Sequence, residues 1–146
     1  MCRVDSELTC CWMMSEGKSV IIVDCDLRNP SLSTSLAPSA ASGIIEVIAE
    51  LHLAGVLTTD GTIDGALASR SPRIVADGRT FSYVLHEGAQ TLSITQNDVR
   101  AIQLAKAALM AGIRLLMERL GVEKVDRIRL AGAFGAHIDV MYATVL

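Results

Sequence analysis

One segment constrains the fold of this chain more than any other: a short apolar strand that runs directly into a glycine-rich turn. Residues 127–139 read Arg-Ile-Arg-Leu-Ala-Gly-Ala-Phe-Gly-Ala-His-Ile-Asp, so the strand ends in Gly132, Ala133 and Gly135. Small residues at a strand end let the backbone adopt unusual dihedral angles and approach a ligand closely. Nucleotides commonly occupy such turns in α/β folds, and a tight strand-to-helix connection without a ligand is the alternative.

A long amphipathic helix is predicted immediately before this strand. Thr95 is the expected N-cap, Asp98 completes a variant of the capping box, and Gly121 stands at the C′ position. The predicted buried face consists of apolar and small residues at a spacing of three and four. Its members are Val99, Ile102, Ala105, Leu109, Gly112, Ile113, Leu116 and Leu120.

These residues carry a resemblance to a known family. The segment Ile94–Asp139, with Thr-Gln-Asn-Asp-Val-Arg-Ala-Ile-Gln-Leu-Ala-Lys-Ala-Ala and then Arg-Leu-Ala-Gly-Ala-Phe-Gly, closely resembles the carboxy-terminal domain of the reductive activators of corrinoid proteins. Upstream, the segment Ser42–Leu51 resembles a helix start of the same domain. That family belongs to the superfamily of acetate and sugar kinases, heat-shock chaperones and actin. The resemblance implies an α/β fold, a partial ribonuclease-H-like (actin-like ATPase) domain with a mixed sheet and flanking helices.

The resemblance also implies cofactors, a partner and site residues. The family binds ATP with Mg²⁺ and couples its hydrolysis to low-potential electron transfer. An iron-sulfur cluster, held in a separate domain, delivers an electron to the cobalt of a corrinoid protein. Carried over to this chain, Gly132, Ala133, Phe134 and Gly135 would lie against the adenine and ribose. Lys106 would reach the nucleotide or remain solvated, and Ser42 with Gly43 would lie near the phosphates.

Some features depart from the family pattern. Residues 1–93 contain no convincing Asp-Gly-Thr type phosphate loop, and Ala41 replaces a glycine that the family has at its helix start. The chain ends at Leu146, before a further glycine-rich segment of the family. We therefore expect a truncated domain with half of a nucleotide site, and whether this chain is itself an enzyme stays open. The alternative function is that of a non-catalytic remnant acting as a structural or protein-interaction domain.

The first forty residues do not share this resemblance. The segment from Gly17 to Leu32 is similar instead to the second Walker-type strand of bacterial tyrosine kinases, which ends in Asp-x-Asp-x-Arg. Gly17-Lys18-Ser19 is not a P-loop, because position 12 is tryptophan and Ser19 opens a β-branched strand. A Ser-, Ala- and Pro-rich stretch over residues 31–42 is typical of a linker. The predicted organisation is a segment 1–40 with one strand, foreign to a domain 41–146; alternatively, Val20–Asp24 supplies a strand to the domain's sheet.

Composition excludes several other classes of function. A net charge of -3 gives no electrostatic footprint for nucleic acid, and the apolar runs are too short to span a membrane. The protein is expected in the cytoplasm. The spacing of Cys2, Cys10, Cys11 and Cys25 fits neither a zinc site nor an iron-sulfur site, so we predict free thiols and no metal.

The middle and the end of the chain are predicted to be structural. The turns Thr59–Thr62 and Ala76–Arg79 flank or join apolar segments, and the second predicts a two-stranded hairpin with arms around Ile74 and Phe81. The isolated histidines His52, His86 and His137 have no ligand spacing. At the C-terminus an apolar edge is expected to favour self-association; it comprises Met141, Val145 and Leu146.

Overall fold

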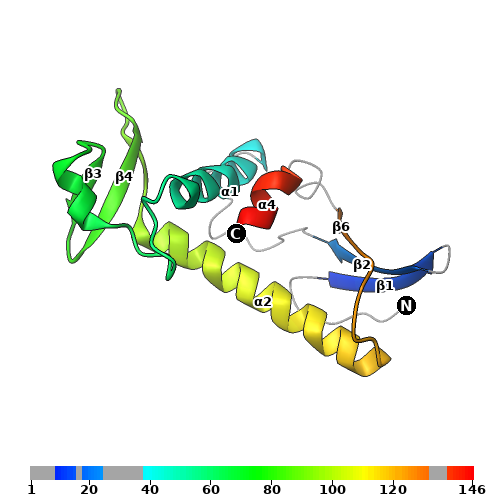
Figure 1. Ribbon diagram of the computed structural model, residues 1–146. Helices are drawn as coiled ribbons and strands as arrows, with labels where there is room; N and C mark the ends of the chain where they lie inside the picture. The colour runs from blue at the N-terminus through cyan, green and yellow to red at the C-terminus, as the bar shows by residue number, and fades with distance from the viewer. Residues whose placement is uncertain (1–8, 16–17, 25–37, 132–137) are drawn as a thin grey trace. The chain divides into compact units, whose positions relative to one another are not determined.

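The computed structural model describes residues 9–15, 18–24, 38–131 and 138–146 of the chain (Figure 1). The fold divides into two compact units. The first unit comprises Met1–Ile44 with Lys106–Val140, and the second comprises Ile45–Ala105 with Met141–Leu146. Residues of α1 (Pro38–Leu53) and of α2 (Gln96–Leu120) belong to both units.

The first unit contains a mixed three-stranded sheet. Strand β1 (Thr9–Ser15) pairs antiparallel with β2 (Lys18–Asp24), and β2 pairs parallel with β6 (Arg127–Ala131), which gives the order β1-β2-β6. The hypothesis that Val20–Asp24 supplies a strand to the sheet is therefore confirmed. Strand β1 was not predicted, because residues 10–14 form a continuous apolar run without the alternation that indicates a half-buried strand.

The C-terminal half of α2 builds the apolar core of this unit. Ile113 and Leu116 are 8% and 1% exposed. Partly buried side chains pack against them, and these are Leu109, Met117, Val125, Leu130 and Ile138. Because Leu130 belongs to β6, this cluster holds the strand against the helix. Of the predicted buried face, Ala105 and Leu120 are instead exposed, since Ala105 stands at the edge of the apolar stripe and Leu120 in the last turn of the helix.

Both predicted ends of α2 are confirmed. The Asp98 carboxylate accepts hydrogen bonds from the Thr95 amide at 2.8 Å and the Thr95 hydroxyl at 2.7 Å, and the Asp98 amide donates to Thr95 Oγ1 at 3.2 Å. At the other end Gly121 has φ +61°. The Gly121 and Val122 amides donate to the carbonyls of Glu118 and Met117, which is the Schellman arrangement.

The second unit combines part of α1 with an antiparallel sheet. Strands β3 (Ile74–Asp77), β4 (Thr80–His86) and β5 (Leu92–Ile94) lie in sequential order, and a 3-10 helix, η1 (Gly65–Ser69), precedes them. The predicted hairpin is confirmed: Asp77 pairs with Thr80 across a turn in which Gly78 has φ +61°. The structure adds β5 as a third strand, which is too short for a periodic signal. Buried apolar side chains come from each part of the unit: Ile48, Ala49, Leu51, Leu57, Ile63, Ile74, Val84, Ile94 and Val99.

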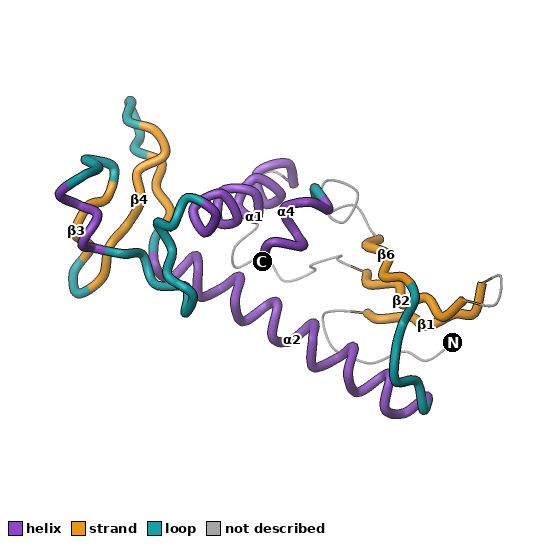
Figure 2. Tube along the Cα trace, in the orientation of Figure 1, coloured by secondary structure: helices purple, strands orange, loops and turns teal. Residues whose placement is uncertain are grey.

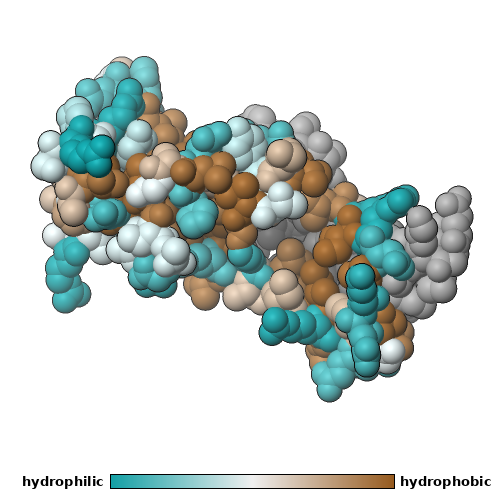
Figure 3. Space-filling view, viewed as in Figure 1, coloured by the Kyte–Doolittle hydropathy of each residue, from teal (hydrophilic) through white to brown (hydrophobic). Residues whose placement is uncertain are grey.

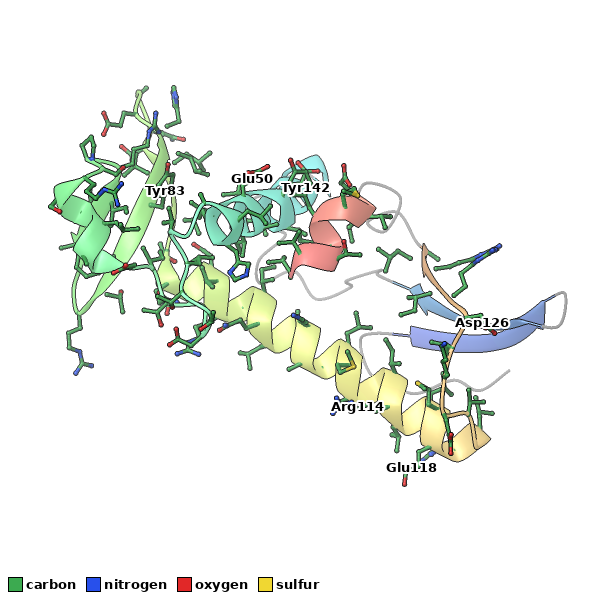
Figure 4. All side chains as sticks on the ribbon, in the orientation of Figure 1. Glu50, Tyr83, Arg114, Glu118, Asp126 and Tyr142 are labelled. Carbon is green, nitrogen blue, oxygen red and sulfur yellow. The ribbon has the colours of Figure 1, made fainter. Side chains whose placement is uncertain are left out.

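Helix α4 (Val140–Val145) belongs to the second unit from Met141 onwards. The Tyr142 hydroxyl donates to the Glu50 carboxylate of α1 at 2.7 Å, and Figure 4 shows the two side chains together. None of the helices in the described part of the chain has the length and the hydropathy of a membrane span.

Gln96, the first residue of α2, joins this helix to a loop more than thirty positions earlier in the chain. Its side chain is 8% exposed. The carbonyl oxygen Oε1 accepts from the Ile63 amide at 2.9 Å, and Nε2 donates to the Gly61 carbonyl at 2.7 Å. The side-chain amide of Gln96 thus forms one hydrogen bond with the Ile63 amide and one with the Gly61 carbonyl, and so fixes the backbone of this loop next to the buried Ile63 side chain.

We expect Gln96→Leu to lower the free energy of unfolding by about 1–3 kcal/mol, because the buried Ile63 amide loses its acceptor. Urea denaturation followed by circular dichroism measures the change. Gln103→Leu is the matched control, since the hydrogen bond from Gln103 Nε2 to the Asp60 carbonyl is exposed. Equal losses in the two variants would contradict the role assigned to Gln96.

Gly65 lets an aromatic ring pack against the start of η1. A Cβ atom at this position would overlap the ring of Phe81 from β4, whereas a Cβ at Gly43 would meet nothing within 4 Å. Overpacked positions of this kind force neighbouring side chains to shift.

Gly65→Ala is therefore expected to cost about 1–3 kcal/mol of stability, because the Phe81 ring must leave its position. Gly43→Ala, which replaces a glycine inside α1 without a steric conflict, is expected to add about 0.5–1 kcal/mol. Thermal melts of both variants beside the parent chain check the two signs. A Gly65→Ala variant with unchanged stability would show that the position of the Phe81 ring does not depend on the absence of a side chain at residue 65.

Candidate functional site

The candidate site lies where two parallel strands end at the same edge of the mixed sheet. Strands β2 and β6 run in register, with Val23 opposite Leu130 and Asp24 opposite Ala131. In open α/β sheets, ligands bind beyond the carboxyl ends of parallel strands. The predicted turn Gly132–Gly135 follows Ala131 directly and lies outside the described residues. The structure nevertheless brings the strand ending in Asp24 and the strand leading to the turn side by side (Figure 1).

Lys106 belongs to the same compact unit as β6, and its side chain is exposed on α2. It stands three residues before Leu109, which packs against the Ile113 and Leu116 cluster. Helical spacing places residues three apart on neighbouring positions of one face. Lys106 therefore lies on the side of α2 that faces the core of the first unit, one turn before that core begins.

Ser42 and Gly43 are part of α1 and not of a loop that precedes it. The helix begins at Pro38, four residues before Ser42 and therefore earlier than the helix start that the sequence suggests. Proline is favoured in the first turn of a helix and alanine throughout it, so Pro38 and Ala40–Ala41 extend the helix backwards. Around Gly43 there is open space, since no atom lies within 4 Å of a Cβ built there.

The letters Asp-Gly-Thr occur at residues 60–62, within a tight turn closed by a bridge between Leu57 and Ile63. The Asp60 carboxylate accepts hydrogen bonds from the hydroxyls of Thr58 and of Thr62, the latter at 3.0 Å. Gly61 has φ +78°, in the region that glycine favours. These bonds use both carboxylate oxygens inside the turn, so the triplet shapes the turn and is no substitute for a phosphate loop.

The hydrogen bonds from Thr58 and then from Thr62 lower the pKa of the exposed Asp60 carboxyl below its ordinary value of 3.8. Because the folded-state pKa is depressed, the stabilisation is present above pH 3.8 and is lost as the pH falls through the folded-state pKa. We expect an NMR titration of Asp60 to show a midpoint below 3.8 that rises in Thr58→Val. Thr59→Val, one position along, is the control and should leave the midpoint unchanged.

The structure describes only some of the cysteines and histidines for which predictions were made. Within the described ranges, no cluster of three His, Cys, Asp or Glu residues is arranged to hold a metal ion. Cys10 and Cys11 lie in β1, whereas Cys2 and Cys25 fall outside the described residues, so the prediction of free thiols stays a prediction. The exposure of His52 and His86 agrees with the surface positions expected for them, and His137 lies outside the described residues.

The mixed sheet and the helix that packs on it define the class of this protein. A family model described as the C-terminal domain of RACo, the ASKHA domain, matches residues 23–146, and the chain belongs to this family. The α/β, actin-like fold predicted from the sequence is therefore confirmed. The match begins inside β2, at residue 23, and thus includes part of the segment 1–40 that was predicted to be foreign.

Among curated proteins, the corrinoid activation enzyme RamQ of Eubacterium limosum is similar to this chain. The two are 39% identical over 111 residues, an alignment that covers 68% of this chain and 19% of the relative. The chain thus corresponds to about a fifth of the length of that enzyme. No solved structure gives a significant match.

Proposed function

We propose that this chain is the nucleotide-binding domain of an ATP-dependent activator of corrinoid proteins, with a corrinoid protein as its partner. Membership of the ASKHA family supports the nucleotide, and similarity to a corrinoid activation enzyme supports the partner. The observation that carries the proposal is the parallel pairing of β2 with β6. This pairing sets Asp24 opposite Ala131, which precedes the glycine turn in the sequence, and α/β folds bind ligands beyond the carboxyl ends of such strands.

We assign each part of Mg-ATP to particular residues near this edge. Gly132, Ala133, Phe134 and Gly135 would approach the adenine and ribose, since small residues leave room for a ligand. The Lys106 ammonium would neutralise phosphate charge. Mg²⁺ usually keeps several waters and binds through one or two carboxylates and the phosphates. We assign one such carboxylate to Asp24, the last residue of β2, and the phosphates to the neighbourhood of Gly43, where a Cβ would meet no atom within 4 Å.

When bound, ATP would supply the free energy that makes an unfavourable electron transfer to cobalt possible. The protein's own contribution would be to bind and orient the nucleotide. We assign the delivery of the electron to an iron-sulfur cluster in a separate domain. The proposed compartment is the cytoplasm, in keeping with cysteines predicted to be free thiols.

A second candidate function is that of a structural or interaction domain without nucleotide chemistry. It is supported by exposed apolar side chains on helix α4: Val140 is 66% exposed and Met141 is 76% exposed. Met141 belongs to the apolar C-terminal edge for which self-association was predicted from the sequence. The two candidates differ in whether the chain binds Mg-ATP.

We expect isothermal calorimetry to show saturable binding of Mg-ATP, and binding to raise the stability by about 2.7 kcal/mol when free ligand is a hundredfold above its Kd. Gly132→Val should abolish binding, because its side chain would occupy the space of the ligand. Lys106→Met should weaken it. Arg79→Met, in the turn of the hairpin, removes a cation of similar exposure in the second unit and should bind as the parent does. A chain that melts cooperatively but binds no nucleotide would contradict the proposal. It would favour the second candidate function, that of a structural or interaction domain.

A further inference from the structure

The second unit contains three Asp-Gly pairs, and the fold holds them differently. They are Asp60-Gly61, Asp64-Gly65 and Asp77-Gly78. In such a pair the amide nitrogen of the glycine can attack the side-chain carboxyl group of the aspartate before it, because no Cβ on the glycine hinders the approach. The product is a cyclic imide. The reaction therefore depends on whether the fold leaves the carboxyl group and the nitrogen free to meet.

The first pair is held at both reacting groups. The two carboxylate oxygens of Asp60 accept hydrogen bonds from the hydroxyls of Thr58 and Thr62. The Gly61 amide donates to the Thr58 carbonyl at 2.9 Å. A Cβ at Gly61 would overlap the Gln103 side chain, so this segment also has little room to rotate. Neither the carboxyl group nor the nitrogen of this pair is free to react.

The second pair is held by a helix cap and by an aromatic ring. Asp64 Oδ1 accepts a hydrogen bond from the Ala66 amide at 2.9 Å, which caps η1. The carboxylate is thereby directed past the Gly65 amide to the next amide along the chain. The Phe81 ring fills the space in which a Cβ at Gly65 would lie, so the backbone cannot rotate here without displacing the ring.

The third pair lacks these restraints. Asp77-Gly78 opens the turn between β3 and β4, which Figure 2 draws as a teal corner between the orange strands. The Gly78 amide donates a hydrogen bond to none of the described residues, and a Cβ at Gly78 would meet no atom within 4 Å. Asp77 Oδ2 accepts one hydrogen bond, from the Ser82 hydroxyl at 2.8 Å. Both residues of the pair are exposed, and Figure 3 shows hydrophilic residues at this end of the hairpin.

We propose that Asp77-Gly78 is a site of isoaspartate formation in the folded chain. The Gly78 nitrogen loses its proton and bonds to Asp77 Cγ, and the protonated carboxyl group loses its hydroxyl, so that one water leaves as the imide closes. Water then adds back at either carbonyl carbon of the imide. Addition at Cγ restores aspartate. Addition at the main-chain carbonyl carbon breaks its bond to the Gly78 nitrogen, leaves the peptide link through Cγ, and yields isoaspartate of unchanged mass.

This rearrangement would open the closing pair of the hairpin. The backbone between Asp77 and Gly78 becomes longer by one carbon atom, at the turn where Asp77 pairs with Thr80. The carboxylate carbon that binds Ser82 through its oxygen becomes part of the main chain. Ser82 is 5% exposed, and a buried hydroxyl that loses its acceptor destabilises a fold. The modified chain is therefore expected to melt at a lower temperature. It would present a free α-carboxylate at residue 77, the group that isoaspartyl carboxyl methyltransferases recognise.

Incubation of the full chain at neutral pH tests the proposal, with the three pairs followed side by side. Electron-transfer dissociation of digested peptides distinguishes isoaspartate from aspartate, and methyl transfer from S-adenosylmethionine by an isoaspartyl methyltransferase measures the modified fraction independently. We expect isoaspartate at residue 60 to form about tenfold or more slowly than at residue 77, because the hydrogen bonds of Asp60 must open first. In urea, where the fold is absent, all three pairs should react at similar rates.

Two variants separate the local chemistry from the protection. Asp77→Glu should abolish the reaction at residue 77, because the larger imide ring closes far more slowly. Thr58→Val should raise the rate at residue 60 and leave residue 77 unchanged, since it removes a hydrogen bond to Asp60 alone. Circular dichroism confirms that each variant remains folded. Equal rates at residues 60 and 77 in the folded chain would overturn the proposal. So would no isoaspartate at residue 77 when the chain in urea reacts at all three pairs.

Discussion

The hydrogen bonds that close the two ends of α2 are the constraint on which both units depend. At its start, Thr95 and Asp98 bind each other's backbone amides, and the adjacent Gln96 holds the backbone of residues 61 and 63. At its end, the turn at Gly121 redirects the chain toward β6. Between these ends, Ile113 and Leu116 provide the surface against which Leu130 packs. A shift in either cap would therefore change the register of the helix face that supports the loop or the strand.

The features that the sequence predicted best are those with local causes. The caps of α2 and the hairpin turn at Gly78 depend on residues a few positions apart, so their signals are contained in short strings. The missed features depend on distant partners. Gln96 pairs with a loop 33 to 35 residues away, and β1 forms by pairing with β2, neither of which periodicity reveals. The exposed Ala105 and Leu120 show that periodicity fixes a helix face but not how far its partner extends along it.

The part of the candidate site that lies in one continuous segment of sequence could be predicted, and the pairing of distant segments could not. The glycine turn after Ala131 was predicted as a site from the sequence, whereas Asp24 was recognised only as the acidic end of a strand, and the two lie near opposite ends of the chain. The parallel register of β2 and β6 sets Asp24 opposite Ala131, the residue before that turn in the sequence. Lys106 lies on the core-facing side of α2. Asp24, Lys106 and Ala131 belong to the same compact unit, which agrees with the proposal of a single nucleotide site.

Hydrogen–deuterium exchange of the full chain with and without Mg-ATP tests the central claim most directly, because it reports where the nucleotide lies as well as whether it binds. The account predicts slower exchange in peptides that cover residues 128–136 and those around Asp24 and Gly43. Peptides from the β3–β4 hairpin should exchange at an unchanged rate. Unchanged exchange at the strand edge in a folded chain, or protection confined to the hairpin, would contradict the assignment of this edge as the nucleotide site.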